Sequence, residues 1–542
     1  MRLGDRSLMK IRSVWGLGGL VVLAVAMGSV AAWGAVPAAD DQAGTLRFFG
    51  APEADLFTRE IADSLQGELD RNFTRVASNG LPAGFVSVSL PGMGWAGSMW
   101  SRDAGTLLRE LTMRGDFKDA ALLANCLIEL VEKNKDGFYS YPRFFRGGAK
   151  ASGTEFDGTA AVVIGLELLW ERLPAADPMR GRIEEFLFKA DSPVNFFKFR
   201  LAAAPLVAGS GEFGCGLSIP GDCYNVVQNY LTVLALTAAA KMATESGKMD
   251  LATEYRGLAD KVRGSMETYL IGPDGAWLWC VDVKTLMADP EILNKKTNLG
   301  FAGINGVAAM YSDVLGLEPL SSSWKGIKVN EVTLAKLYET PLRKQEFDKY
   351  GMWTQFDALA DGLLTGPSYG QGYAVQTALL YDKTAMAEKA LDYLASATYK
   401  PVYQVHRDSP YYFYERMYSP DAVGKTELAE GTGALNLVNV TEPLKVSRLL
   451  LGVDDSSLDV VRILPRIPKN WTGVEARNWP VRTRAGVVRA DILFVQKGTG
   501  AEMTVKVAGG MQIDDLKVRM PSKNGYVWQE QKHVSGARFV TR

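Results

Sequence analysis

The strongest constraint in this sequence is a succession of helical patterns between residues 53 and 450. Apolar residues recur there at positions i, i+3, i+4 and i+7, which is the spacing of a helix with one buried face. Segments 156–173 and 224–246 are apolar nearly all round, whereas 249–270 is amphipathic. Buried helices that alternate with solvent-facing ones predict nested helical hairpins, and about a dozen helices would close an (α/α)6 toroid. The predicted helices span residues 53–74, 103–114, 117–134, 156–173, 180–190, 224–246, 249–270, 299–315, 328–338, 371–382, 384–397 and 432–451.

The pattern changes near residue 455 to short runs with a period of two, such as "GVVRADILFVQ" and "AEMTVKVAGG". Alternation of this kind, interrupted by glycine and proline, predicts antiparallel strands. We therefore expect a mainly α protein, with a helical domain over residues 45–452 and a small antiparallel β domain over residues 455–542.

The N-terminus has the composition of an export signal. Four basic residues within the first twelve positions precede the uncharged run 14–36, and small residues follow it. This pattern predicts a signal peptide over residues 1–38, with cleavage after Ala31 or Ala38 and a periplasmic or extracellular protein. The run is long enough to span a bilayer, so an uncleaved signal-anchor is the alternative. Cleavage would leave no membrane segment.

The composition excludes several kinds of site. The chain has only two histidines, His406 and His533, which argues against histidine-based metal sites and Ser-His-Asp triads. Its 60 basic and 61 acidic residues give a net charge of −1, which argues against nucleic acid as a partner. No cofactor-binding motif occurs in a supporting context, so we expect no cofactor. Calcium stays open, because its ligands are ordinary oxygen atoms.

The four cysteines divide into two kinds. Cys215 and Cys223 lie eight residues apart and could close a tight loop in an exported protein. Cys126 and Cys280 lie inside apolar patterns, which favours buried thiols.

Long loops beside the predicted inner helices combine glycine, aromatic residues and carboxylates. Loops of this length in a compact domain are usually functional. With histidine scarce, the reactive side chains are Asp and Glu, as in glycoside hydrolysis. There, one carboxylic acid protonates the leaving oxygen, and a second carboxylate, roughly 6.5–9.5 Å away in inverting enzymes, activates water.

The stretch "MWSRDAGTLLREL", residues 99–111, resembles the Trp-x-Arg-Asp helix start of the six-hairpin glycosidases. These include glucoamylases, glycogen-debranching glucosidases, processing α-glucosidases and α-L-rhamnosidases. Residues 224–266 resemble their central hairpin, 433–453 their last inner helix, and 461–481 the start of their C-terminal β domain. The resemblance implies that residues 45–452 form an (α/α)6 catalytic domain. It also implies an exported enzyme that removes terminal sugars from an oligo- or polysaccharide with inversion.

The resemblance assigns substrate-holding roles at this helix start. Trp100 would stack on the sugar, while Arg102 and Asp103 would bond adjacent hydroxyls. The alternative for Asp103 is an N-cap or a first-turn charge. For Trp95 we expect a core-filling role.

The family's general acid lies on the loop that enters the central hairpin, where this chain offers Glu212 and, as the alternative, Asp222. Asp222 precedes a predicted helix and could simply cap it. The sequence around both departs from the family's pattern. The family's general base lies about twenty residues before the middle of the last inner helix, which points to Glu415. Glu430 is its competitor.

Other loop residues are weaker candidates for substrate binding. Glu155 and Asp157 precede a predicted inner helix, where capping is the alternative. Tyr369 and Gln371 open a later inner helix. His406 lies in a polar loop cluster.

Two other functions remain open. The first is a polysaccharide lyase or sugar epimerase on the same toroid, although such enzymes generally need His or Tyr to move a proton. The second is a non-catalytic carbohydrate-binding protein, which would not need carboxylates on opposite walls of one cavity. The sugar, its linkage and the oligomeric state do not follow from the sequence.

Overall fold

The computed structural model describes residues 42–88, 95–209, 223–278, 280–287, 326–338, 363–365, 371–397, 416–418, 429–430 and 437–542, with a few isolated positions. The predicted signal peptide and the predicted helix 299–315 lie outside these ranges. Within them, no helix is long and apolar enough to cross a membrane.

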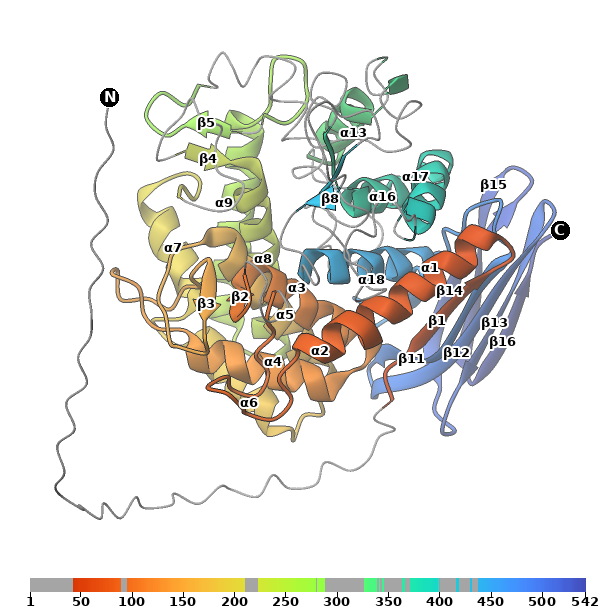
Figure 1. The fold of residues 1–542 in the computed structure, drawn as a ribbon, viewed down its shortest axis with the longest axis horizontal. Coiled ribbons are helices and arrows are strands. Elements are labelled where there is room, and N and C mark those ends of the chain that lie inside the picture. The colour runs from red at the N-terminus through yellow and green to blue at the C-terminus, as the bar shows by residue number, and fades with distance from the viewer. Residues whose placement is uncertain are drawn as a thin grey trace, which may run out of the picture. The chain divides into compact units, whose positions relative to one another are not determined.

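Helices form most of the described residues up to residue 451 (Figure 1). Eleven of the twelve predicted helices fall in described residues, and each is confirmed with small shifts of its ends, the first being interrupted by a π-helical segment at Asp63–Leu69. One further helix, α7, was not predicted. The helices are α1 (Pro52–Ala62), α2 (Asp70–Asn72), α3 (Ser101–Arg114), α4 (Phe117–Leu130), α5 (Phe156–Arg172), α6 (Pro178–Phe188), α7 (Pro193–Ala203), α8 (Val226–Glu245), α9 (Met249–Tyr269), α13 (Gly326–Tyr338), α16 (Gln371–Leu380), α17 (Thr384–Ala397) and α18 (Leu437–Leu451).

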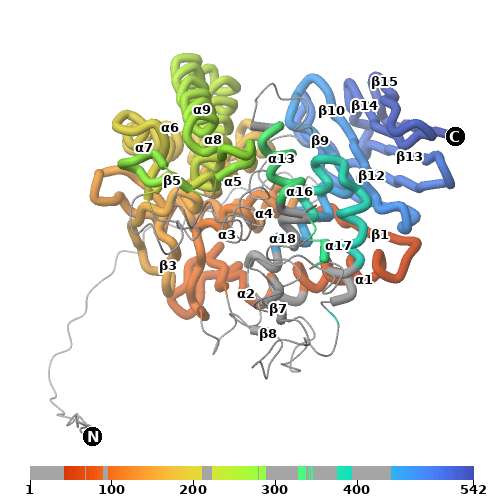
Figure 2. Tube along the Cα trace, turned by 90° about the horizontal axis from the view of Figure 1, so that it is seen from above, coloured from red at the N-terminus to blue at the C-terminus, as the bar shows by residue number. Residues whose placement is uncertain are grey.

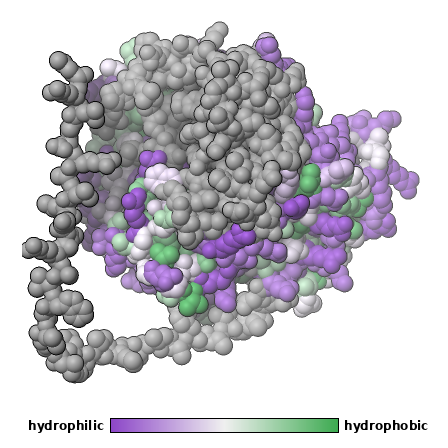
Figure 3. All heavy atoms as spheres, in the orientation of Figure 1, coloured by the Kyte–Doolittle hydropathy of each residue, from purple (hydrophilic) through white to green (hydrophobic). Residues whose placement is uncertain are grey.

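Two sheets form the C-terminal region, which confirms the predicted β structure. The five-stranded sheet has the order β1-β11-β12-β13-β16, and the four-stranded sheet has the order β15-β14-β10-β9. Their strands are β1 (Thr45–Phe49), β9 (Val453–Asp454), β10 (Val461–Ile463), β11 (Gly473–Thr483), β12 (Gly486–Lys497), β13 (Gly500–Val507), β14 (Ile513–Ser522), β15 (Gly525–Val534) and β16 (Gly536–Val540). On the face drawn in Figure 3, hydrophilic and hydrophobic residues are interspersed over these strands.

Two details of these sheets differ from the prediction. Strand β1 pairs with β11, so residues 45–49 belong to the C-terminal sheet and not to the helical domain. Strands β10 and β14 pair in parallel, whereas the other strand pairs of the two sheets are antiparallel. Both pairings join distant parts of the chain, and a local alternation pattern carries no information about them.

Short strands precede or follow several helices. They are β2 (Ser98–Trp100) paired with β3 (Phe144–Arg146), β4 (Cys223–Asn225) paired with β5 (Cys280–Asp282), and a small sheet of β6 (Leu363–Thr365), β7 (Arg416–Tyr418) and β8 (Ala429–Glu430).

Helices α3 and α5 touch through their backbones. A Cβ atom on Gly105 of α3 would lie 2.6 Å from the carbonyl carbon of Ala161 in α5, and one on Gly165 would lie 2.7 Å from the Gly105 oxygen. Near the helix starts, a Cβ atom on Gly158 would lie 3.2 Å from Cβ of Ser101. These contacts run in the same order along both helices, so α3 and α5 are parallel and begin side by side.

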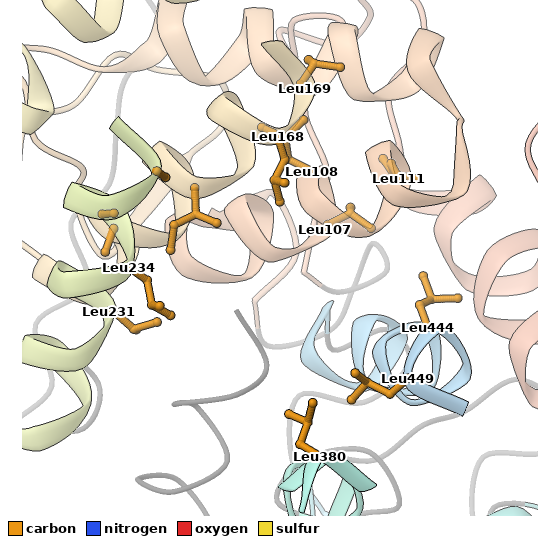
Figure 4. Close-up of a cluster of buried hydrophobic side chains, with 14 of the residues drawn as sticks. Leu107, Leu108, Leu111, Leu168, Leu169, Leu231, Leu234, Leu380, Leu444 and Leu449 are labelled. Carbon is orange, nitrogen blue, oxygen red and sulfur yellow. The ribbon is translucent and has the colours of Figure 1, made fainter. Parts of the chain in front are cut away.

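Other apolar helices continue this arrangement. Helix α8 packs beside α5, and α18 packs beside both α3 and α16 (Figure 2). Leucine side chains of these five helices gather in the interior (Figure 4). The more polar helices α9 and α17 cover α8 and α16 respectively. This is the predicted alternation of inner and outer helices.

Ion pairs join the helical part to the C-terminal sheets, and Arg172, Asp455 and Arg482 are buried in them. Arg172 Nη2 at the end of α5 lies 2.7 Å from Asp455 Oδ1, and the backbone N–H of Arg482 donates to Asp455 at 2.7 Å. The Arg482 guanidinium binds both oxygens of Glu245, at the end of α8, at 2.7 Å. All of these contacts lie at the C-terminal ends of α5 and α8.

Glu167 of α5 lies near this interface, and its carboxyl group has no hydrogen-bond partner among the described residues. Neither oxygen of the buried Glu167 accepts a hydrogen bond. Lys241 Nζ lies 3.7 Å away and is also paired with Glu171. Burial raises the pKa of Glu167 to about 8, although Lys241 opposes the shift.

Replacing Gly105 tests the contact between α3 and α5. The new methyl group of Gly105→Ala would meet backbone atoms that cannot move independently, so we expect a loss of about 1–3 kcal/mol or more in the free energy of unfolding. Gly257 on α9 is the matched control, because a Cβ atom there meets nothing within 4 Å. Gly257→Ala should stabilise by about 0.4–1 kcal/mol. Urea denaturation measures both, and equal effects would contradict the contact.

Glu167→Gln tests the raised pKa. Between the ordinary pKa of 4.5 and about 8, the folded state holds a proton that the unfolded state has lost. The contribution of Glu167 to stability is therefore complete below pH 4.5 and falls as the pH rises to about 8. Relative to the wild type, Glu167→Gln should gain about 1.4 kcal/mol per pH unit across this window. Glu185→Gln, at an exposed position of α6, is the control, and parallel profiles for the two variants would refute the prediction.

Candidate functional site

The start of α3 is fixed to the two-stranded sheet formed by β2 and β3. Trp100, the last residue of β2, lies opposite Phe144 of β3. The next residue, Ser101, donates its backbone N–H to the Arg143 carbonyl at 3.1 Å and its hydroxyl to the Pro142 carbonyl at 2.6 Å. The β2–β3 sheet and the residues before β3 therefore set the position of the first turn of the helix.

Three aromatic rings form a cluster at this small sheet. Trp95 meets Trp100 edge to face with ring centroids 5.5 Å apart, and Phe144 lies 5.5 Å from Trp100. The guanidinium carbon of Arg143 lies 4.5 Å from the Trp100 centroid. Trp95 is only partly buried, so it supports Trp100 at the surface as well as packing on the core.

Arg102 and Asp103 follow in the first turn of α3, and both are almost completely buried. Arg102 Nε lies 3.3 Å from Asp103 Oδ1, and its Nη1 lies 3.5 Å from Asp157 Oδ2. The N-cap residue of α3 is Trp100, and its side chain makes no capping bond. Asp103 is therefore a first-turn charge and not the N-cap.

The start of α5 brings two more carboxylates to the same place. Asp157 is fully buried and accepts the backbone N–H of Gly158 at 2.9 Å. Glu155 holds the N-cap position of α5 but makes no side-chain capping bond, and its Oε2 lies 3.1 Å from the position of a Cβ atom on Gly158. The structure thus joins Arg102, Asp103, Glu155 and Asp157 at two neighbouring helix starts, where the positive ends of the helix dipoles favour anionic groups.

Helix α8 starts with polar residues that were not predicted as site residues. The Asn225 side chain accepts the N–H of Val227 at 2.8 Å, and Asn229 donates to the Val207 carbonyl at 3.1 Å. Gln228 between them is fully buried, and neither polar atom of its amide has a hydrogen-bond partner among the residues that the structure describes. The sequence pattern that could have indicated these residues is the group of polar side chains at the start of an otherwise apolar helix.

A network of buried charges lies deeper in the helical part. Glu110 of α3 lies 3.2 Å from Arg448 of α18, and Glu442 of α18 binds Lys445 at 2.7 Å and also Gln376 of α16. Burial raises the pKa of Glu442. Burial opposes the charge of Glu110 as well, but Arg448 and Arg109 together with Lys445 outweigh it and hold the pKa of Glu110 below its usual value. Glu110 lies seven positions after Asp103 in the same helix, so this network lies about 10 Å below the helix starts.

Several predicted site residues lie outside the described residues: Glu212, Asp222, Tyr369, His406 and Glu415. Gln371 is the first residue of α16, and Glu430 lies in β8 opposite Arg416 of β7, but the side chains of Gln371 and Glu430 are not described.

The cysteines agree in part with the prediction. Cys126 and Cys280 are buried and lie outside any disulfide bond, as predicted. Cys223 is disulfide-bonded, while the predicted partner Cys215 lies outside the described residues. Among the residues described, no group of three or more His, Cys, Asp or Glu side chains could hold a metal ion.

No family model and no curated protein matches this chain. Its fold is similar to that of solved glycosidases. The α-L-rhamnosidase from Dictyoglumus thermophilum matches with a TM-score of 0.56 at 11% identity, over 92% of this chain and 50% of that one. A GH78 family rhamnosidase from a Bacillus species matches with a TM-score of 0.54 at 14% identity, over 88% and 42%. The α-L-rhamnosidase from Aspergillus terreus matches with a TM-score of 0.52 at 11% identity, over 92% and 50%.

These matches confirm, at the level of the fold, the resemblance to six-hairpin glycosidases that the sequence predicted. The chain spans about half the length of these three rhamnosidases.

Asp157→Ala tests whether the buried charges hold the two helix starts together. The change removes a carboxylate that faces Arg102 and the acceptor of the Gly158 N–H. Breaking a buried pair of this kind typically costs about 3–5 kcal/mol in the free energy of unfolding. Asp177, the N-cap of α6, is a matched control at a helix start that is only partly buried, and Asp177→Ala should cost about 1 kcal/mol. Equal losses would show that Asp157 is an ordinary cap.

Proposed function

We propose that this protein is an exported glycoside hydrolase with an (α/α)6 toroid, which removes terminal sugars from an oligo- or polysaccharide with inversion. The observation that carries the proposal is the meeting of Trp100, Arg102, Asp103 and Asp157 at two parallel helix starts. This arrangement lies in a chain whose fold matches that of three rhamnosidases.

The helix starts have the chemistry needed to hold a sugar. The aromatic cluster of Trp95, Trp100 and Phe144 offers apolar ring surface to the C–H face of a sugar. Arg102 supplies donors and Asp103 supplies acceptors for neighbouring hydroxyls. Because both are largely buried, their hydrogen bonds to a ligand would form in a medium of low dielectric constant, where such bonds are stronger than in water.

The chemical step is assigned from the sequence. Glu212, with Asp222 as the alternative, donates a proton to the glycosidic oxygen while the bond from that oxygen to the anomeric carbon breaks. Glu415, with Glu430 as the alternative, takes a proton from the water that attacks the opposite face of that carbon. The pairing of Glu430 with Arg416, the neighbour of Glu415 in the chain, supports treating the two candidate bases as competitors at one place.

Three further elements support the proposal. Gln371 opens α16, one of the apolar helices that also include α3, α5, α8 and α18. The signal-like segment over residues 1–38 supports export to the periplasm or the extracellular space. The disulfide bond at Cys223 agrees with an oxidising compartment.

A panel of aryl glycosides tests the function and its base together. The wild type should hydrolyse at least one member of a panel that includes α-L-rhamnoside, α-D-glucoside and α-D-mannoside, and NMR should first detect the product with the inverted anomeric configuration. Loss of the general base in Glu415→Gln should lower kcat by about 10²–10⁴-fold.

Glu430→Gln is the matched variant, and it should keep most of the activity. A large loss in Glu430→Gln alone would move the base to Glu430. Full activity in both variants, or a product with retained configuration, would contradict the two-carboxylate inverting mechanism.

A further inference from the structure

The chain segment that contains β3, beside the candidate site, carries a local excess of positive charge. Residues 137–154 contain three basic residues, Arg143, Arg146 and Lys150, and no acidic residue, although the whole chain is nearly neutral. All three side chains are exposed. The excess is therefore confined to one segment and faces solvent.

None of the three has a carboxylate partner. Arg143, Arg146 and Lys150 form no ion pair or side-chain hydrogen bond with any part of the chain that the structure describes. Other arginines at the surface do so: Arg182 lies 3.2 Å from Glu129, and Arg477 lies 2.8 Å from Glu475. Within the described part of the chain, direct contacts thus do not neutralise the charge of this segment.

Two of these cations rest on the aromatic cluster. Besides Arg143 on Trp100, Arg146 lies on Phe144, with its guanidinium carbon 5.2 Å from the ring centroid. Stacking on a ring holds a guanidinium in place and leaves the N–H groups at its edge available to an acceptor. A planar fork of this kind matches the two oxygens of a carboxylate or a sulfate.

The neighbouring carboxylates do not cancel this charge at the surface. Asp103, Glu155 and Asp157 are at most 5% exposed, and Arg102 faces two of them. By contrast, Arg143 and Arg146 are exposed to solvent, on the rings of Trp100 and Phe144. A ligand that approaches the helix starts along the aromatic cluster would therefore meet Arg143 and Arg146 first.

We infer that the β2–β3 sheet, through the segment that contains β3, recognises an anionic sugar, one that carries a carboxylate or a sulfate group. This inference rests on the proposed glycosidase function and names its substrate class. Arg143 and Arg146 bind the anionic group, and the rings of Trp100 and Phe144 hold the two guanidiniums in place. Lys150 adds to the local potential.

Two matched pairs of polymers test the inference with the full chain. Polygalacturonate and its fully methyl-esterified form differ in carboxylate charge, and dextran sulfate and dextran differ in sulfate charge. In affinity electrophoresis, the protein should bind the charged member of at least one pair about tenfold more tightly than the neutral member. Added salt should reduce the preference. The pair that shows it distinguishes a uronic acid from a sulfate ester.

Variants separate specific recognition from general charge. The double variant Arg143→Gln/Arg146→Gln should lose the preference, and Arg143→Lys/Arg146→Lys, which keeps the charge but not the fork, should retain part of it. The control Lys506→Gln/Lys523→Gln removes two exposed charges from the C-terminal sheets and should retain all of it. Thermal unfolding of each variant verifies that it is folded.

Equal binding of both members of each pair, or an equal loss in the Lys506→Gln/Lys523→Gln control, overturns the inference. The hydrolysis of neutral aryl glycosides is measured separately. Activity on them without any preference for a charged polymer would therefore refute the anionic substrate class alone. Failure to hydrolyse any glycoside would count against the proposed function.

Discussion

The backbone contact between α3 and α5 positions the candidate site. Because Gly105 and Gly165 have no side chains, the two helices approach more closely than larger residues would allow, and they run parallel. Their first turns therefore lie side by side, and residues 55 positions apart in sequence, Arg102 and Asp157, come into contact. A wider spacing would separate these charges and open the helix starts to water.

The candidate site depends equally on charge that is kept out of water. Removing Arg102, Asp103 and Asp157 from solvent costs free energy, and they compensate one another only in this geometry. The same holds for Glu110 and Arg448 below them. Charged groups held next to one another in this way can exchange one hydrogen-bond partner for another. A ligand with many hydroxyl groups offers such partners. In this account, the polar interior serves binding more than stability.

The sequence predicted the helices well because the apolar spacing of each is a local property. It missed α7, where the polar and apolar residues of 193–203 are interspersed around the helix and leave no clear polar face. It also placed residues 45–49 in the helical domain, because the pairing of β1 with β11 joins strands more than 400 residues apart. At the site, the Trp-x-Arg-Asp stretch pointed to Arg102 and Asp103, which lie together in the first turn of α3. The partner of Arg102 and the stacked Arg143 depend on tertiary contacts that no single segment reveals.

The central claim is that a sugar binds where α3 and α5 begin. The most direct measurement is a crystal structure of the protein with the monosaccharide released from its best aryl glycoside. The account predicts hydroxyl groups of the sugar within hydrogen-bond distance of Arg102 and Asp103, and its ring against the cluster of Trp95, Trp100 and Phe144. A sugar bound elsewhere, with the helix starts closed over by protein, would contradict it.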